Sequence, residues 1–170
     1  MDRISIHVRR VIRPSERLLK GAMLALAILF LLLGILFSRG MMLPCFLTAM
    51  AYLWYDHATK RDYEYVLEND TLKIDRLMER GRVSLHEIPF REIKLLARPD
   101  DPAVAPYRKG GSEKVKKFDY TSYEEGKPWY TLIAREDGET VKLLLDLNDE
   151  AIQAIRRANR AAVKVSGPTL

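Results

Sequence analysis

The hydrophobic and polar positions divide the chain into one long apolar segment and a region of short alternating runs. Between Gly21 and Tyr55, Arg39 is the only charged residue. One helix over this segment would be about 52 Å long at 1.5 Å per residue, against a hydrocarbon core of about 30 Å. It would also leave Arg39 in lipid, at a cost of roughly 2.5–3.5 kcal/mol. We therefore predict a transmembrane α-helical hairpin over residues 17–57, with helices at about 18–38 and 40–55 and a turn at 38–40.

The flanking charges predict the orientation of this hairpin. Residues 1–20 contain six basic and two acidic residues, whereas residues 56–170 contain 21 of each. The net charge of +5 therefore lies in the amino-terminal segment and at Arg39. Because basic residues stay on the cytoplasmic side of a span, we predict a multi-pass protein of the cell membrane with both termini in the cytoplasm. A folded region without net charge gives no indication of nucleic-acid binding.

Other arrangements of the amino-terminal region stay open. A single span, with residues 40–55 lying in the interface, would place the folded region outside. A cleaved signal peptide fits less well, because no A-x-A site follows and a second apolar segment comes immediately. The basic arm over residues 1–16 is predicted to lie on anionic lipid as a short interfacial helix. The alternation of Ile4, Ile6 and Val8 would also fit a strand.

Beyond Asp56, turn signals separate seven alternating runs that predict strands. These runs are 63–68, 71–78, 83–88, 92–98, 114–120, 129–135 and 140–146. Asn69-Asp70 predicts a hairpin turn, and the composition of residues 99–113 predicts a loop.

A final helix is predicted at about 149–163, capped by Asn148 and carrying an apolar stripe. Seven strands and one helix predict a mainly-β domain over residues 58–165, followed by a tail at 166–170. We expect a bent antiparallel barrel closed at one end by the helix. An α+β sheet with one packed helix is the alternative.

Several of these features resemble a known family. Seven strands followed by one helix is the element order of the pleckstrin-homology-like (PH-like) fold. The run GRVSLHEIPFREIKLLA resembles two strands and the intervening turn of bacterial PH-like domains. The wider arrangement of the chain resembles a family of small bacterial two-span membrane proteins with a PH-like cytoplasmic domain. The resemblance lies in the basic start, the two adjacent spans, and the runs YEYVLENDTLKIDRLMERGR and NDEAIQAIRRANR. The resemblance covers nearly the whole chain. The shared motifs are structural, so the resemblance implies a fold and does not point to an activity.

The order of the strands predicts which basic groups face the bilayer. If neighbouring strands reverse direction, the turn at 80–82 and the end of the helix return towards the membrane. The candidate contacts with anionic lipid are Arg80, Arg82, Arg156, Arg157 and Arg160. PH domains that bind phosphoinositides use a basic loop between their first two strands. Here that loop is predicted to be the acidic Glu68-Asn69-Asp70, so specific phosphoinositide binding is not expected.

The sequence contains no recognisable catalytic motif. His7, His57 and His86 are scattered, and Cys45 lies in the apolar segment. No H-E-x-x-H, G-x-S-x-G or phosphate-binding loop is present. We therefore expect no enzyme, catalytic residue, metal or cofactor, and no small-molecule ligand. Tyr107, Tyr123 and Trp129 are the exposed aromatic residues best suited to a protein partner.

These observations predict a membrane-anchored, non-enzymatic PH-like interaction or scaffold module at the cytoplasmic face of a bacterial membrane. Its partners would be the lipid bilayer and another membrane or membrane-associated protein. One alternative is an accessory or regulatory subunit of a membrane transporter or envelope complex, with the hairpin packed against other spans. Another is a sensor of anionic lipid surfaces.

Overall fold

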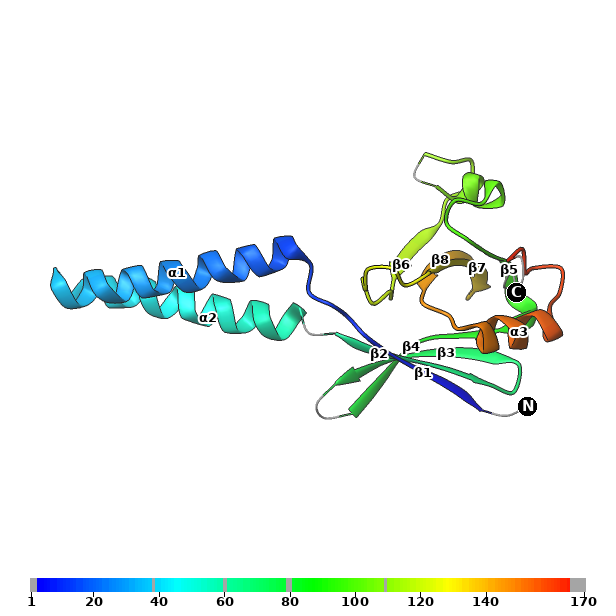
Figure 1. Ribbon diagram of the computed structural model, residues 1–170, viewed down its shortest axis with the longest axis horizontal. Coiled ribbons are helices and arrows are strands. Elements are labelled where there is room, and N and C mark those ends of the chain that lie inside the picture. The colour runs from blue at the N-terminus through cyan, green and yellow to red at the C-terminus, as the bar shows by residue number, and fades with distance from the viewer. Residues whose placement is uncertain (1–2, 38, 60, 79–80, 109, 166–170) are drawn as a thin grey trace. The chain divides into compact units, whose positions relative to one another are not determined.

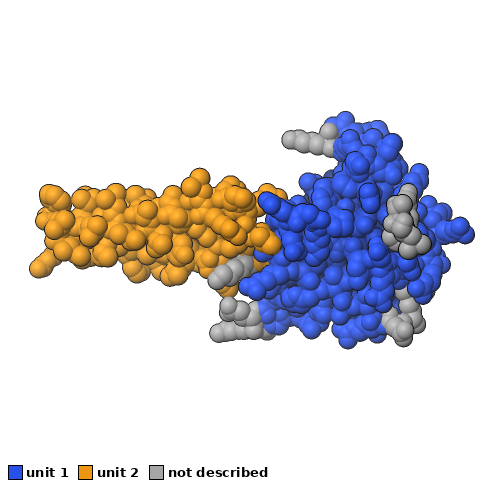
Figure 2. Space-filling view, in the orientation of Figure 1, with its two compact units in different colours: residues 1–10, 62–170 blue, residues 11–61 orange. Residues whose placement is uncertain are grey.

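The computed structural model describes residues 3–37, 39–59, 61–78, 81–108 and 110–165. The chain divides into two compact units (Figure 2). One consists of residues 11–61, and the other combines residues 1–10 with residues 62–170. The first unit is helical and the second is mainly β-structure (Figure 1). The predicted tail at 166–170 lies outside the described residues.

The helical unit is a pair of helices joined by a short turn. Helix α1 spans Pro14–Leu36, the 3₁₀ turn η1 spans Arg39–Met41, and helix α2 spans Met42–Thr59. Small residues on α1 allow the helices to approach closely: Gly34 lies against Met42, and the Cys45 thiol lies 3.4 Å from the carbonyl oxygen of Ala27. At the other end of the pair, Lys20 Nζ lies 2.7 Å from Asp56 Oδ1.

Within the described residues, α1 alone is long and apolar enough to span a membrane, with a mean hydropathy of 2.5. The second predicted span, at 40–55, is not confirmed. Helix α2 is long enough but less apolar, because it ends in the polar run Tyr55, Asp56 and His57. The predicted turn at 38–40 overlaps η1 at residues 39–40, and Ser38 lies outside the described residues.

The first sheet, sheet A, contains four antiparallel strands in the order β1-β2-β3-β4. Its strands are β1 (Ile4–Arg9), β2 (Asp62–Glu68), β3 (Thr71–Met78) and β4 (Gly81–Pro89). Asn69 and Asp70 join β2 to β3 with φ values of 51° and 56°. Both values lie in the left-handed region that a tight hairpin turn requires, so this predicted turn is confirmed.

Strand β1 corrects the prediction of a helical arm on the membrane. It pairs with β2 from Ile4↔Leu67 to Arg9↔Asp62. Ile4, Ile6 and Val8 pack against the core, and Val8 is fully buried. The alternating pattern therefore prevails over the helical one, because β2 offers a partner edge and a hydrophobic face. Residues 10–61 consequently form the connection between the first two strands of the domain.

The second sheet, sheet B, has the order β5-β7-β8-β6. Its strands are β5 (Ile93–Ala97), β6 (Lys116–Asp119), β7 (Tyr130–Glu136) and β8 (Glu139–Leu145). Strand β6 runs parallel to β8, whereas the other pairs are antiparallel. The 3₁₀ turn η2 (Phe90–Glu92) joins the two sheets.

The closed seven-stranded barrel is therefore wrong: the described strands are eight and form two separate sheets. Residues 162–164 occupy the edge of β5 at which β4 would have to pair to close a barrel. Leu96 N donates to Ala162 O at 2.8 Å, and Lys164 N donates to Leu96 O at 2.9 Å. The edge of β5 is thus paired with residues 162–164 and not with β4. The arrangement is an α+β fold with one packed helix, which agrees with the alternative in class, but it has two sheets where the alternative had one.

Helix α3 (Asp149–Ala158) packs on the main core through Ile152 and Ile155. Asn148 caps it, with its side chain accepting from Ala151 N at 2.9 Å. The helix ends at Ala158 and not at about 163. Asn159 terminates it, because its side-chain amide donates to the carbonyl oxygens of Phe90 and Ile93 at 3.0 and 2.9 Å.

The predicted loop 99–113 contains the 3₁₀ helix η3 (Pro102–Tyr107). It covers the face of sheet B that points away from the main core. Val104 packs there against Leu95, Ala97 and Ile133 in a second, smaller hydrophobic cluster. Sheet B is thus buried on both faces over part of its width.

Candidate functional site

A buried polar chain of three side chains connects the two sheets. His86 on β4 is 8% exposed. Its Nδ1 lies 2.5 Å from Glu136 Oε2 at the end of β7, and its Nε2 lies 2.8 Å from the Tyr120 hydroxyl after β6. Glu136 Oε1 also accepts from the backbone N–H of Glu87 at 3.1 Å. The carboxylate therefore binds both a side chain and the exposed edge of β4.

The environment of Tyr120 keeps its hydroxyl group protonated. Burial, with smaller effects from Tyr63 and Glu136, raises the pKa of Tyr120 to about 12. The phenol is therefore protonated at neutral pH and is available as a donor. In the His86 tautomer that carries its proton on Nδ1, the phenol donates to Nε2 and the Nδ1–H donates to Glu136. Each group is satisfied by its neighbour. The arrangement is suited to joining sheets A and B, and we assign it no proton-transfer role.

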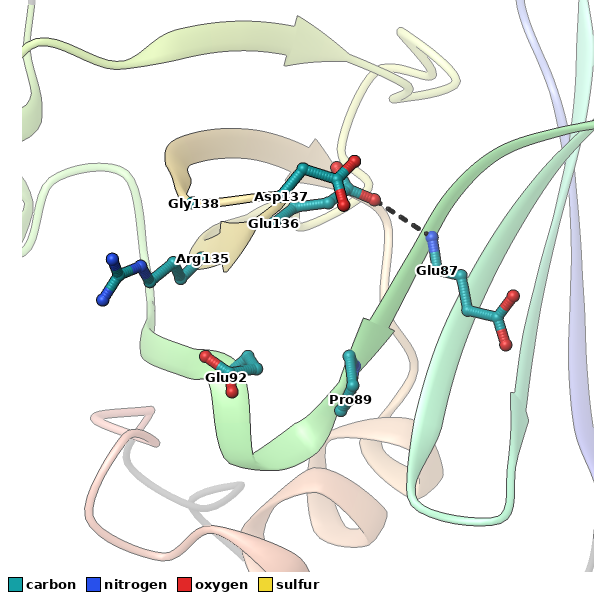
Figure 3. A pocket seen from close by; sticks show the side chains of 7 residues that line it. All are labelled: Glu87, Pro89, Glu92, Arg135, Glu136, Asp137 and Gly138. Atoms are coloured by element: carbon teal, nitrogen blue, oxygen red, sulfur yellow. Dashed lines mark hydrogen bonds between the residues drawn. The ribbon is translucent and has the colours of Figure 1, made fainter.

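Next to this chain, a pocket of about 480 Å³ opens at the rim between the sheets (Figure 3). Its lining residues are Glu87, Pro89, Glu92, Arg135, Glu136, Asp137 and Gly138. Figure 3 shows the Glu136 carboxylate directed at the backbone nitrogen of Glu87. The Glu87 carboxylate lies 3.0 Å from Lys73 Nζ and points away from the other lining residues in Figure 3. The carboxylates of Glu92, Glu136 and Asp137 outnumber the guanidinium of Arg135, so the pocket favours a positively charged group. No cluster suited to a metal ion occurs among the residues that the structure describes.

The candidate lipid contacts lie in different environments. Arg82 NH1 is 2.5 Å from Glu64 Oε2. Arg156 donates to the carbonyl oxygen of Val165. Arg157 and Arg160 are exposed, and Arg80 lies outside the described residues. Contact of these five with lipid stays a prediction.

The structure does not bring Arg82 and the arginines of α3 together. Arg82 is the register partner of Leu77, which pairs with Asp62 at the end of sheet A where β2 begins. The carboxyl end of α3 lies at the opposite end, because Asn159 binds Phe90 and the Phe90 N–H donates to Asp70 O at 2.7 Å. The prediction that the helix returns towards the 80–82 turn is therefore wrong. It assumed that each strand reverses the direction of the one before it, whereas β5 and β6 both run opposite to β7 and so share one direction.

The acidic loop at 68–70 also has a different place from the one predicted. It joins β2 to β3 and so is the second connection of sheet A. The first connection is residues 10–61, which contain α1 and α2. Glu68-Asn69-Asp70 therefore provides no argument about phosphoinositide binding.

The three candidate aromatic residues for a protein partner differ in exposure. Tyr107 is half-buried and packs on the smaller cluster outside sheet B. The Tyr123 ring lies under the Arg10 guanidinium at 4.1 Å, and its hydroxyl donates to Asp119 at 3.0 Å. Trp129 is 38% exposed. A partner contact stays a prediction for all three, and Trp129 offers the most open side chain.

Sequence reasoning missed the chain Glu136–His86–Tyr120 and predicted no partner for His86. The alternation of side chains along a strand gives one indication that His86 is buried. His86 and Ile88 are two residues apart in β4 and therefore share the inward face. Their partners Ile74 and Leu72 are fully buried. No sequence pattern places Glu136 or Tyr120 beside His86, because these contacts depend on how the two sheets pack.

Comparison with known proteins gives one match. The family model described as bacterial PH-like domain (DUF6106) matches residues 6–165. No curated protein and no solved structure matches the chain. The matched range runs from β1 to the residues after α3, so it includes both helices of the connection between β1 and β2. The chain therefore belongs to the bacterial PH-like domain (DUF6106) family.

Proposed function

We propose that the protein is a membrane-attached PH-like interaction module. Helices α1 and α2 enter the bilayer as a hairpin, and the β domain binds a partner at the cytoplasmic face. The observation that carries the proposal is the pairing of β1 with β2, from Ile4↔Leu67 to Arg9↔Asp62, on either side of the apolar α1. This pairing places both ends of residues 10–61 in one sheet.

The pairing limits the ways in which α1 can cross a bilayer. A single crossing would leave β1 and β2 on opposite sides, where they could not pair. If α1 crosses, the chain must return through α2. Helix α1 has 23 residues and α2 has 18, or about 35 and 27 Å at 1.5 Å per residue. Both lengths are close to the hydrocarbon core of about 30 Å.

The exposed surface of the helical unit supports insertion. In the most apolar part of α1, 11% of the residues are buried. Leu18, Ile35 and Leu36 are 77%, 66% and 72% exposed, and Phe46 and Trp54 on α2 are 61% and 76% exposed. A patch of this kind on a soluble protein would be a liability for aggregation. Lipid would cover it without any further protein.

The acidic pocket at the rim of the sheets is the surface that we assign to the partner. A lysine or arginine side chain of an adjacent protein would find the carboxylates of Glu92 and Asp137 there. Attachment to the membrane raises the effective concentration of domain and partner. The charge of the pocket provides selectivity more than affinity.

The proposal is tested with the full chain, purified in a mild detergent from its native membranes, and with quantification of the proteins that accompany it. Replacing Glu92→Gln and Asp137→Asn together removes two negative charges from the pocket and keeps Glu136 for its contact with His86. A protein retained at equal amounts by the original chain and lost by this variant supports the proposal. The matched control is Glu125→Gln, an exposed carboxylate outside the pocket. Equal retention by all three chains, or no accompanying protein, contradicts the pocket as the partner site.

A second candidate function is that of a subunit of a larger membrane complex. Small residues Gly21, Ala22 and Ala25 are exposed on α1, and an added Cβ at Gly21 would have no atom within 4 Å. Such a surface allows another helix to approach closely. Replacing residues 14–59 with an unrelated two-helix hairpin distinguishes the two proposals. Loss of the partner supports the subunit, and retention supports the interaction module.

A further inference from the structure

Three basic side chains come together on the outer face of sheet B. Lys117 on β6 and Lys142 on β8 are register partners, so their side chains lie on the same face. Lys142 is 9% exposed, and its ammonium donates to the carbonyl oxygen of Tyr107 at 3.1 Å. Arg108 follows Tyr107, and its guanidinium donates to Pro99 O at 3.1 Å. Two strands and the end of η3 therefore supply one cation each.

This arrangement is unfavourable without a counter-charge. Like charges placed opposite each other on neighbouring strands destabilise a sheet, and burial of an ammonium adds a desolvation cost. The pKa of Lys142 is lowered, first by burial and then by the positive charges of Lys117 and Arg108. A bound anion would relieve each of these effects.

The carboxylates on the neighbouring strands are engaged elsewhere. Asp119 on β6 accepts hydrogen bonds from Thr121 and from the Tyr123 hydroxyl. Glu139 on β8 lies 2.5 Å from Lys116 Nζ. Over the described ranges of the chain, no ion pair links Arg108, Lys117 or Lys142 to a carboxylate.

We propose that Arg108, Lys117 and Lys142 form a binding site for a phosphate group. The guanidinium fork of arginine matches two phosphate oxygens. An ammonium has three donors, and Lys142 uses one of them on Tyr107 within the described residues. A phosphate monoester carries about −1.5 to −2 charges at neutral pH, which balances most of the three cations. The site lies in the β domain and does not depend on the proposed membrane attachment.

The first experiment uses the full chain in a mild detergent and inorganic phosphate as the probe, at constant ionic strength. We expect phosphate to raise Tm in a saturable manner, because it binds the folded state. The double variant Arg108→Gln, Lys117→Gln should lose this rise. Lys142 is left in place, because its contact with Tyr107 supports the fold. The matched control, Arg157→Gln with Arg160→Gln on α3, removes two exposed arginines and should keep the rise.

The second experiment identifies the source of the phosphate group. The full chain is placed in nanodiscs of phosphatidylcholine, with or without phosphatidic acid. If the lipid headgroup occupies the site, phosphatidic acid raises Tm for the original chain and not for the double variant, and added phosphate has no further effect. If the ligand is soluble, added phosphate raises Tm equally in both discs. The proposal is overturned if neither probe changes Tm, or if the change is the same in the double variant.

Discussion

At the residue scale, the best-defined feature is the chain Glu136–His86–Tyr120. It connects three segments that are far apart in the sequence, and His86 makes side-chain hydrogen bonds at both ring nitrogens. Aromatic contacts surround it: the rings of Phe118 and His86 are 4.7 Å apart, and those of Tyr63 and Tyr120 are 5.0 Å apart. Because these polar groups are buried, removing one partner leaves the others unsatisfied.

The substitution Glu136→Ala should lower the free energy of unfolding by about 1–3 kcal/mol, because it leaves His86 Nδ1 and the Glu87 N–H without their acceptor. Urea unfolding of the full chain in a mild detergent would measure this. Fluorescence of Trp129 in a Trp54→Phe background reports on the β domain. Glu139→Ala is the matched control, since its pair with Lys116 is exposed and such pairs contribute about 0–1 kcal/mol. Equal losses in the two variants would argue against the inter-sheet role of Glu136.

Two tyrosines make the stability of the domain sensitive to alkaline pH. Burial raises the pKa of Tyr120 to about 12 and also raises the pKa of Tyr65 well above its ordinary value. Both phenols are therefore protonated more readily in the folded than in the unfolded chain. Their contribution to stability is complete below about pH 10. That of Tyr120 is lost as the pH rises through its pKa of about 12, and that of Tyr65 is lost at pH values well above 10.

We therefore expect the urea midpoint to fall between pH 10 and pH 12, and to fall less steeply in Tyr120→Phe. The difference between the two chains isolates Tyr120 from the lysines that titrate in the same range. Tyr120→Phe should be less stable than the original chain at pH 8, since it cannot donate to His86. Identical slopes for both chains would contradict the assignment of the buried phenol.

At the element scale, the sequence predicted the strands of the β domain well and their assembly poorly. Local signals were sufficient for the Asn69-Asp70 turn, the Asn148 cap and the seven strands after Asp56. Strand β1 was only the alternative prediction for the basic arm, because its six residues fit a helix and a strand equally well and its partner β2 lies beyond the apolar segment. The parallel pairing of β6 and β8, and with it the site at Lys117 and Lys142, has no local signal.

The packing of α1 on α2 depends on Gly34. An added Cβ there would lie 3.4 Å from Met42 N and Cγ, so Gly34→Leu should separate the two helices. Gly21→Leu is the control, because its Cβ would meet no atom within 4 Å. Oxidation of Ala27→Cys should form a disulfide with Cys45, whose thiol lies 3.4 Å from the Ala27 carbonyl. We expect Gly34→Leu to reduce the disulfide yield and Gly21→Leu to leave it unchanged. Equal yields would show that Gly34 does not control the approach of the helices.

At the scale of the whole molecule, the two helices are inserted between the first two strands of the β domain. The matched range of the family, residues 6–165, includes the helices together with the strands. A domain whose first strand precedes the apolar segment cannot be removed from it without losing that strand. The segment proposed to attach the protein to the membrane is thus inserted within the fold of the β domain. Both connections to the helices begin at the end of sheet A where Arg9 pairs with Asp62.

The most direct test of this proposal is the sidedness of the segments on either side of the helices. Ser5→Cys in β1 and Ser112→Cys before β6 each provide a single exposed thiol in a Cys45→Ala background. We predict that a membrane-impermeant maleimide labels neither position in intact bacterial cells and labels both once the membrane is opened. Labelling of only one of the two in intact cells would place β1 and the rest of the domain on opposite sides, and labelling of both would place the domain outside. Either result would contradict the cytoplasmic hairpin-anchored module proposed for this protein.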